Sequence, residues 1–145
     1  MTKLLLPFFA VLVLTLSAPL LHADPASIQG YSPVAYFTEN KPVKGSPDYA
    51  SEHDGRTYYF QNAEEVAIFE ADPAKYAPRF QICAYSLSTG AKREIDPTNF
   101  KVVGGSLLLF HRSDNADGLF AFENSGLSDE QLIERADAQY KLLEF

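Results

Sequence analysis

Three side chains in this sequence offer soft or borderline metal ligands: Cys83, His53 and His111. Thiolate and imidazole groups suit copper and zinc, and the neighbouring Glu52 and Asp54 could add carboxylate oxygens to His53. Three protein ligands with an open fourth position would form a mononuclear site. If the protein binds a transition metal, copper or zinc, we expect Cys83 to be the first ligand and the two histidines to be secondary.

Cys83 also has two readings that involve no metal. It is the only cysteine of the chain, which excludes an internal disulfide and a multi-cysteine zinc or iron–sulfur site. Ile82, Ala84 and Tyr85 surround it, so the favoured reading is a buried structural thiol. The alternative is a reactive thiol that supports a redox function.

Other chemistry finds little support in the sequence. No nucleophile elbow, phosphate-binding loop or dinucleotide fingerprint occurs, so we expect no enzymatic activity. The segment from Ser113 to Asn124 approaches an EF-hand but lacks the first aspartate and the final glutamate, which argues against calcium binding. Several tyrosines, among them Tyr36, Tyr58 and Tyr85, could line an aromatic pocket, although filling the core is the favoured role.

The first 23 residues have the layout of a secretory signal. Lys3 precedes an apolar stretch from Leu4 to Leu21, and Ala23 offers a small residue before a cleavage point. An uncleaved membrane anchor is the alternative, but prolines and hydroxyl residues interrupt the stretch. We therefore expect a signal peptide over 1–23, a mature domain over 24–145, no membrane span after cleavage, and a secreted protein, most simply in a bacterial periplasm.

The charge of the chain argues against one class of partner and suggests another. All 145 residues carry a net charge of −7, which disfavours nucleic-acid binding. Residues 113–145 hold eight acidic and two basic side chains. A solvated helix face explains this simply, and a docking surface for a basic protein partner is the sharper alternative.

Turn and strand signals predict two hairpins. Residues 49–53 and 56–60 flank Asp54-Gly55, a pair that suits a two-residue turn with positive φ. Residues 100–103 and 107–110 flank Gly104-Gly105 in the same way. We also expect a short strand over 34–37, an extended lead-in over 24–33, a turn at Asp96-Pro97 and a polar loop over 113–118.

Capping signals predict the helices. Asn62 can cap a helix with Glu65 as its capping-box partner, and Asp72-Pro73 can start a short helical turn. Ser128 with Gln131 predicts a C-terminal helix. The apolar faces should comprise Ala63, Val66, Ala67 and Phe69 in the first helix, and Leu132, Ile133, Ala136, Tyr140 and Leu143 in the last. Residues 79–90 read as a buried segment, helix or strand. The predicted class is α+β, a small single domain with two β-hairpins packed against short helices and a C-terminal helix.

Several motifs resemble the YHS-domain family. They are the run from Gly30 to Phe37, Lys41 to Gly45, Tyr58-Tyr59-Phe60, Asp72-Pro73, and Lys75 to Pro78. Cys83-Ala84-Tyr85 is similar to a signature of the secreted branch. The resemblance covers residues 30 to about 110, and it implies an association with metal ions, mainly in the cysteine-rich branch.

The chain departs from that family pattern at the positions that bind metal. Where the cysteine-rich branch has two metal-binding cysteines, this sequence has Gln61 and Glu65, neither of which supplies a thiolate. Phe80-Gln81-Ile82 replaces the Gly-Gly pair that leads into Cys83 in the secreted branch. We therefore expect an exported, non-enzymatic binding module for a metal ion or a small ligand. The alternatives are a thiol-dependent redox protein and an interaction protein that docks through its C-terminal helix.

Overall fold

The computed structural model describes residues 26–143. The predicted signal peptide lies outside these residues. Within them, no helix has both the length and the apolar character needed to cross a membrane.

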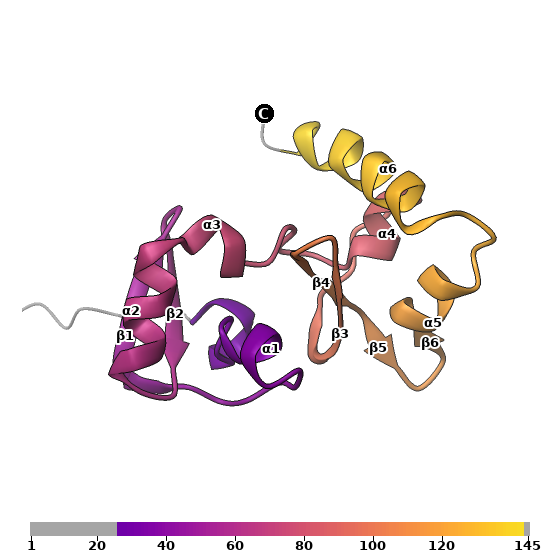
Figure 1. Ribbon diagram of the computed structural model, residues 1–145. Helices are drawn as coiled ribbons and strands as arrows, with labels where there is room; N and C mark the ends of the chain where they lie inside the picture. Colours follow the sequence, from indigo (N-terminus) through magenta and orange to yellow (C-terminus); the bar gives the residue numbers. More distant parts are fainter. Residues whose placement is uncertain (1–25, 144–145) are drawn as a thin grey trace, which may run out of the picture.

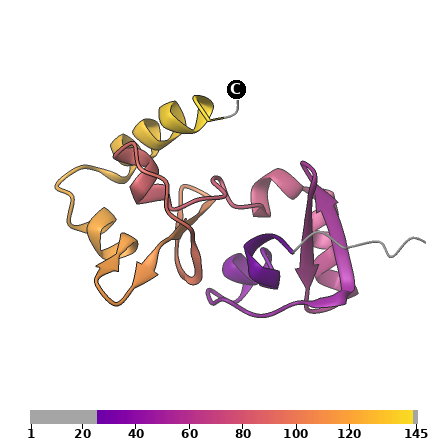
Figure 2. The same ribbon diagram turned by 180° about the vertical axis from the view of Figure 1, so that it is seen from behind.

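The elements form two groups, and the β3–β4 hairpin, which belongs to the second group, lies where the two groups meet (Figures 1 and 2). The first group contains η1 (Ser27–Gly30), α1 (Ala35–Thr38), β1 (Ser46–His53), β2 (Arg56–Phe60), α2 (Ala63–Ala71) and α3 (Pro73–Tyr76). The second contains α4 (Ala84–Ser88), β3 (Asp96–Val103), β4 (Ser106–Phe110), β5 (Arg112–Ser113), β6 (Ala116–Asp117), α5 (Gly118–Glu123) and α6 (Asp129–Lys141).

Both predicted hairpins are present, and the α+β class is confirmed. β1 pairs antiparallel with β2, with His53 opposite Arg56, and β3 pairs antiparallel with β4, with Val103 opposite Ser106. Asp54 and Gly55 both have positive φ, at 49° and 70°, as the two-residue turn requires. Each hairpin also contains a register shift at its open end.

The strand β4 forms a wall between two hydrophobic cores. Leu108 and Phe110 pack with α4, α5 and α6, whereas Leu107 and Leu109 pack with α1, β2 and α2. Each of these four side chains is at most 1% exposed. Alternate side chains of a strand point to opposite faces, so a continuous apolar run buries both faces at once.

The C-terminal helix follows its capping prediction. Ser128 and Gln131 exchange the two hydrogen bonds of a capping box at the start of α6. Leu132 and Ala136 are buried, and Ile133 and Tyr140 pack against the same core. The prediction was wrong for Leu143, which lies beyond the helix end and is 37% exposed.

The helix α2 begins at its predicted cap but buries a different face. Asn62 accepts a hydrogen bond from the Glu65 backbone N–H, and Phe69 is buried. Ala63 and Ala67 are exposed, so their assignment to the inner face was wrong. Glu65 was wrongly assigned as the capping-box partner, because its carboxylate accepts from the N–H of Gln61 instead of the N–H of Asn62.

Four local predictions were wrong. The short strand predicted over 34–37 is absent. Residues 35–38 form a helical turn, because the Phe37 and Thr38 amides donate to the Val34 carbonyl and no described strand pairs with this segment. The turn predicted at Asp96-Pro97 is instead the start of β3. The Asp96 carboxylate accepts a hydrogen bond from the Thr98 N–H where the register of this strand shifts. The loop at 113–118 contains β5 and β6, and the lead-in contains the turn η1. The helix α5 was not predicted.

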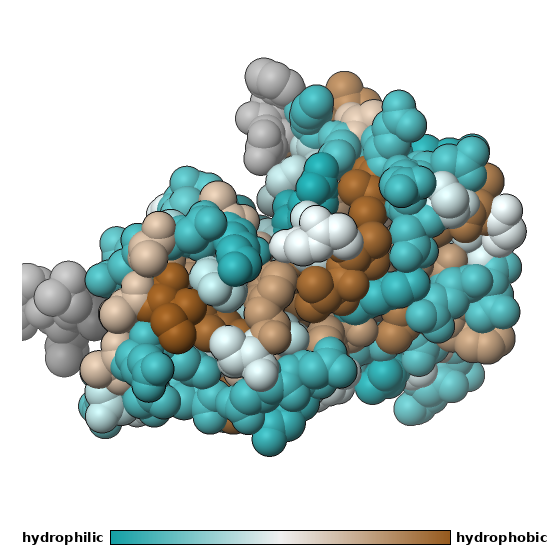
Figure 3. Space-filling view, viewed as in Figure 1, coloured by the Kyte–Doolittle hydropathy of each residue, from teal (hydrophilic) through white to brown (hydrophobic). Residues whose placement is uncertain are grey.

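The open question about residues 79–90 is settled in favour of a helix. α4 spans Ala84–Ser88, with Cys83 at its N-cap position. Its short length leaves Phe80 and Ile82 outside the helix, although both contribute to the second core. The surface is largely hydrophilic, with an apolar band in the middle of the face that Figure 3 shows.

Candidate functional site

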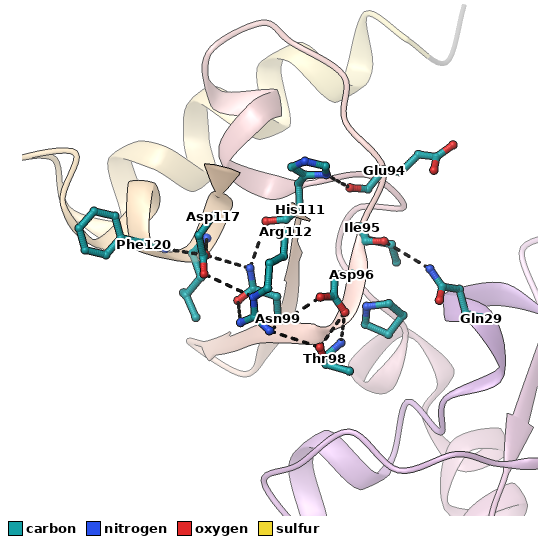
Figure 4. Close-up of polar contacts among 12 residues, drawn as sticks. Gln29, Glu94, Ile95, Asp96, Thr98, Asn99, His111, Arg112, Asp117 and Phe120 are labelled. Carbon is teal, nitrogen blue, oxygen red and sulfur yellow. Dashed lines mark hydrogen bonds and ion pairs between the residues drawn. The ribbon is translucent and has the colours of Figure 1, made fainter. Parts of the chain in front are cut away.

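One segment, residues 91–95, joins α4 to β3 outside any helix or strand, and we call it the crossing segment because it forms hydrogen bonds with both groups of elements. Its backbone carbonyls accept hydrogen bonds from three different parts of the chain. The Arg93 carbonyl accepts from the Cys83 N–H at 2.9 Å, and the Glu94 carbonyl from the His111 imidazole at 3.1 Å. The Ile95 carbonyl accepts from the Gln29 side chain at 3.4 Å (Figure 4). The segment is thereby fixed without belonging to a sheet.

A pocket of about 320 Å³ lies on one side of the crossing segment, between α4, α5 and His111. We call it the α4–α5 pocket. Its volume is near the lower end of the range of small-molecule sites. Three alanines and Gly118 leave space for it, and its polar lining comes from Tyr85, Ser86, Thr89, Arg93, His111 and Asp117.

Ser86 contributes a hydroxyl group that has no partner among the described residues. The residue is 6% exposed. Its backbone is fully engaged, since its N–H donates to the Cys83 sulfur at 3.5 Å and its carbonyl accepts from Ala91 and Thr89. Within residues 26–143, no side-chain nitrogen or oxygen is both inaccessible and without a partner. The Ser86 hydroxyl must therefore reach accessible space, and Ser86 lines this pocket.

The hydrogen bond made by His111 determines which of its two ring nitrogens is free to accept another. Its Nδ1 lies 3.1 Å from the Glu94 carbonyl oxygen, which can only accept a hydrogen bond. Nδ1 therefore carries a proton, and in the neutral ring Nε2 is the acceptor. Nε2 makes no hydrogen bond with any described residue, so it is available to a ligand.

A polar network beneath the pocket holds His111 and α5 in place (Figure 4). The fully buried Asn99 donates to the His111 carbonyl at 3.1 Å and to the Asp117 carboxylate at 3.0 Å. Arg112 donates to Asn99 at 2.9 Å and contacts Asp117 at 3.4 Å. Asp117 also caps α5 by accepting from the amides of Leu119 and Phe120.

This network lowers the pKa of Asp117 below its ordinary value. The hydrogen bond from Asn99 is the main cause, followed by the backbone N–H of Phe120. With so many donors, the carboxylate has little capacity left for a ligand. The polar loop predicted over 113–118 does not include this cap, although an aspartate before Gly118 and an apolar run is a helix-cap signal.

Cys83 lies directly behind the pocket wall. It is 0% exposed and packs in the second core. Gly118 covers it so closely that a Cβ there would lie 2.9 Å from the Cys83 sulfur and 3.2 Å from the His111 backbone N and O. The thiol therefore faces packed protein and not the pocket.

The three predicted metal ligands are not grouped together. Cys83 and His111 both pack against Gly118, but His53 ends β1 beside the first core, with its Nε2 3.3 Å from the Asp54 carboxylate. The His53 ring lies nearly perpendicular to the Phe69 ring, with the ring centroids 6.1 Å apart. Residues 26–143 contain no group of three or more His, Cys, Asp or Glu side chains arranged to hold a metal ion.

Gln61 and Glu65, which stand where the resemblance would place two metal-binding cysteines, lie together. Gln61 donates from its side chain to Glu65 at 2.7 Å and to Glu39 at 2.6 Å. Glu65, 7% exposed, also accepts from the Ser32 hydroxyl at 2.7 Å and the Gln61 N–H at 2.8 Å. These contacts fasten α2 to the segment before α1.

The acidic side chains of α6 are partly used within the molecule. Asp137 makes a two-point contact with Arg79, at 2.8 and 3.0 Å, and Asp129 lies 3.1 Å from Lys101. Glu130 and Glu134 are exposed, next to the exposed Arg135. Much of the acidity of this helix therefore holds it against the rest of the domain.

A larger cavity of about 610 Å³ lies at the other side of the crossing segment. Its rim includes Ile28 and Gln29, which have positive φ values of 48° and 53°. A β-branched residue is rarely found in this conformation. Ser27 and Tyr58 fix the Gln81 amide on its wall, at 3.1 and 3.2 Å.

Comparisons of the chain with protein-family models, curated proteins and solved structures find no match.

Proposed function

We propose that the protein is a non-enzymatic binding module that holds a small polar ligand in the α4–α5 pocket. The observation that carries the proposal is the Ser86 hydroxyl, which lies in a residue only 6% exposed, has no described partner and lines the pocket. Because this hydroxyl reaches accessible space and engages no described residue, it is free to form a hydrogen bond with a ligand.

His111 complements Ser86 as a recognition group. Its bond to the Glu94 carbonyl fixes the ring and leaves Nε2 as an acceptor. Asp117 is engaged by several donors, so the pocket offers a donor and an acceptor with no free carboxylate beside them. This combination suits recognition of a ligand better than proton transfer.

The proposal is for a small molecule and not for a transition metal. Among residues 26–143, His53 lies apart from Cys83 and His111, and no three-ligand cluster is present. Membership of the YHS-domain family and export after cleavage behind Ala23 are part of the proposal. Both rest on the motifs and the leader in the sequence. Mass spectrometry of the exported protein should give a chain that starts at Asp24.

Ligand-induced NMR shifts would test the pocket as a binding site. A set of small neutral, anionic and cationic fragments is added to the isotope-labelled mature chain, and the backbone amide shifts are mapped. We expect at least one fragment to shift Ser86, His111 and Gly118 while leaving His53 unchanged.

Two helix α4 variants provide the matched comparison. Ser86→Ala removes the free hydroxyl, whereas Ser88→Ala removes one that already donates to the Tyr85 carbonyl. We expect Ser86→Ala, but not Ser88→Ala, to weaken the binding by about tenfold. Equal affinities for both variants, or fragment shifts confined to other surfaces, would overturn the proposal.

A further inference from the structure

We infer that the ligand of the α4–α5 pocket is a small carboxylate that also carries a hydrogen-bond donor. This inference rests on the proposed function, and it names the chemical class that this site would take. Three features of the lining carry it: the charge that is left unpaired, the hydrogen-bonding groups that are left free, and the volume.

The unpaired charge at the pocket is positive. Arg93 lines the pocket and forms no ion pair with any residue between 26 and 143, whereas the Asp117 carboxylate is engaged by Asn99, Arg112 and two backbone amides. A guanidinium group matches the planar geometry of a carboxylate and can donate two parallel hydrogen bonds to it. An anionic ligand therefore fits this lining better than a cationic one.

The free hydrogen-bonding groups add a second requirement. Ser86 can donate to a ligand oxygen, and a carboxylate has enough lone pairs to accept from it and from Arg93 together. The Nε2 of His111 accepts in the neutral ring, so the ligand needs an O–H or N–H group that donates to it. A hydroxy or amino acid of small size meets both requirements.

The pocket volume limits the size of this ligand. About 320 Å³ corresponds to roughly ten water volumes. A molecule with up to about ten non-hydrogen atoms could occupy it. Lactate and 4-hydroxybenzoate are suitable probes, since each combines one carboxylate with one hydroxyl group. The larger of the two, 4-hydroxybenzoate, nearly fills the pocket volume.

Calorimetric titration of the mature chain would test the ligand class. Each probe is compared with its neutral amide, lactamide or 4-hydroxybenzamide, which keeps the shape and removes the charge. We expect at least one carboxylate to bind at least about tenfold more tightly than its amide. Arg93→Gln should remove most of this preference, whereas Lys92→Gln should retain it, because both residues are exposed but only Arg93 lines the pocket.

The outcomes separate this inference from the proposed function. If the amides bind as well as the carboxylates, or if Arg93→Gln and Lys92→Gln behave alike, the carboxylate class is wrong. In that case, sensitivity to Ser86→Ala would still support the pocket. If neither acid binds saturably at about 10 mM, the class is overturned as well. If Ser86→Ala changes no affinity for any bound probe, the binding function itself fails.

Discussion

The imidazole of His111 donates from Nδ1 to the Glu94 carbonyl across 3.1 Å. This hydrogen bond joins the residue that follows β4 to the crossing segment. Glu94 lines the larger cavity, whereas His111 lines the α4–α5 pocket. This hydrogen bond thus lies between the larger cavity and the α4–α5 pocket, and it determines which nitrogen of the His111 ring can bind a ligand.

The first prediction concerns the tautomer of His111. In the neutral state its ring should carry the proton on Nδ1, because the Glu94 carbonyl can only accept. Nitrogen-15 NMR of the imidazole distinguishes the two tautomers, and His53 provides the internal comparison, since no backbone carbonyl among residues 26–143 forms a hydrogen bond with its ring. A predominantly Nε2-protonated His111 would contradict the assigned hydrogen bond and weaken the proposed function.

A second prediction follows from the contact between Gly118 and Cys83. Gly118→Ala would place a Cβ 2.9 Å from the Cys83 sulfur, so we expect a loss of about 1 to 3 kcal/mol in the free energy of unfolding. Denaturant unfolding of Gly118→Ala, Cys83→Ala and the double variant measures the coupling. The double variant should lose less than the sum of the two single variants, by at least about 0.5 kcal/mol. Strict additivity would mean that the sulfur is not the obstacle.

The sequence predicted the elements whose signals are local. Asp54-Gly55 and Ser128 with Gln131 each specify their turn or cap within a few residues, so the hairpin and α6 appear where expected. Val34 to Phe37 carries an apolar pattern without a partner strand, and here the amides bond within the segment to give a helical turn. Local composition cannot show whether a partner strand exists.

The candidate site was only partly predictable. His111 was singled out from its residue type, but its companions Ser86 and Arg93 are common residues, and only the fold brings them to one pocket. Sequence separation also does not reveal which residues share a core. His53 packs beside the first core, whereas Cys83 lies in the second. The strand β4 separates the two cores, and its apolar run alone does not reveal a wall with two packed faces.

The third prediction concerns the reactivity of the Cys83 thiol, on which the redox alternative depends. The thiol is 0% exposed and covered by Gly118, so a reagent should reach it only after the domain opens. We expect native protein to react at least about a thousandfold more slowly than unfolded protein. The rate is followed with a chromogenic disulfide at neutral pH, with and without denaturant. Rapid native reaction would favour a redox role over a structural one.

The fourth prediction is a pH dependence due to Asp117. Its folded-state pKa is lowered below the ordinary value of 3.8, chiefly by the Asn99 hydrogen bond. The carboxylate therefore stabilises the fold above that value, and this contribution is lost as the pH falls through the folded-state pKa. Asp117→Asn keeps a capping side chain but does not titrate. We expect the stability difference between wild type and this variant to shrink between about pH 5 and about pH 2.

Asp114→Asn is the control for this pH series. Asp114 is an exposed residue of the same turn and makes no described side-chain hydrogen bond. Its substitution should leave the stability profile close to that of the wild type. A constant difference between wild type and Asp117→Asn over the whole pH range would contradict the assignment of the acid dependence to this carboxylate.

The fifth prediction compares two acidic side chains of α6. Asp137 binds Arg79 through both carboxylate oxygens, whereas Glu134 is exposed, so only Asp137 should matter for stability. Partial solvent exposure screens the ion pair, and we expect Asp137→Ala to cost about 1 kcal/mol and Glu134→Ala less than about 0.5 kcal/mol. Amide exchange within α6 should accelerate in the first variant alone, since the contact fastens this helix to the chain before α4. Equal amide exchange rates in both variants would mean that the Asp137–Arg79 contact does not hold α6 in place. The acidic face of α6 would then be a solvated surface that a partner could bind but that the fold does not need.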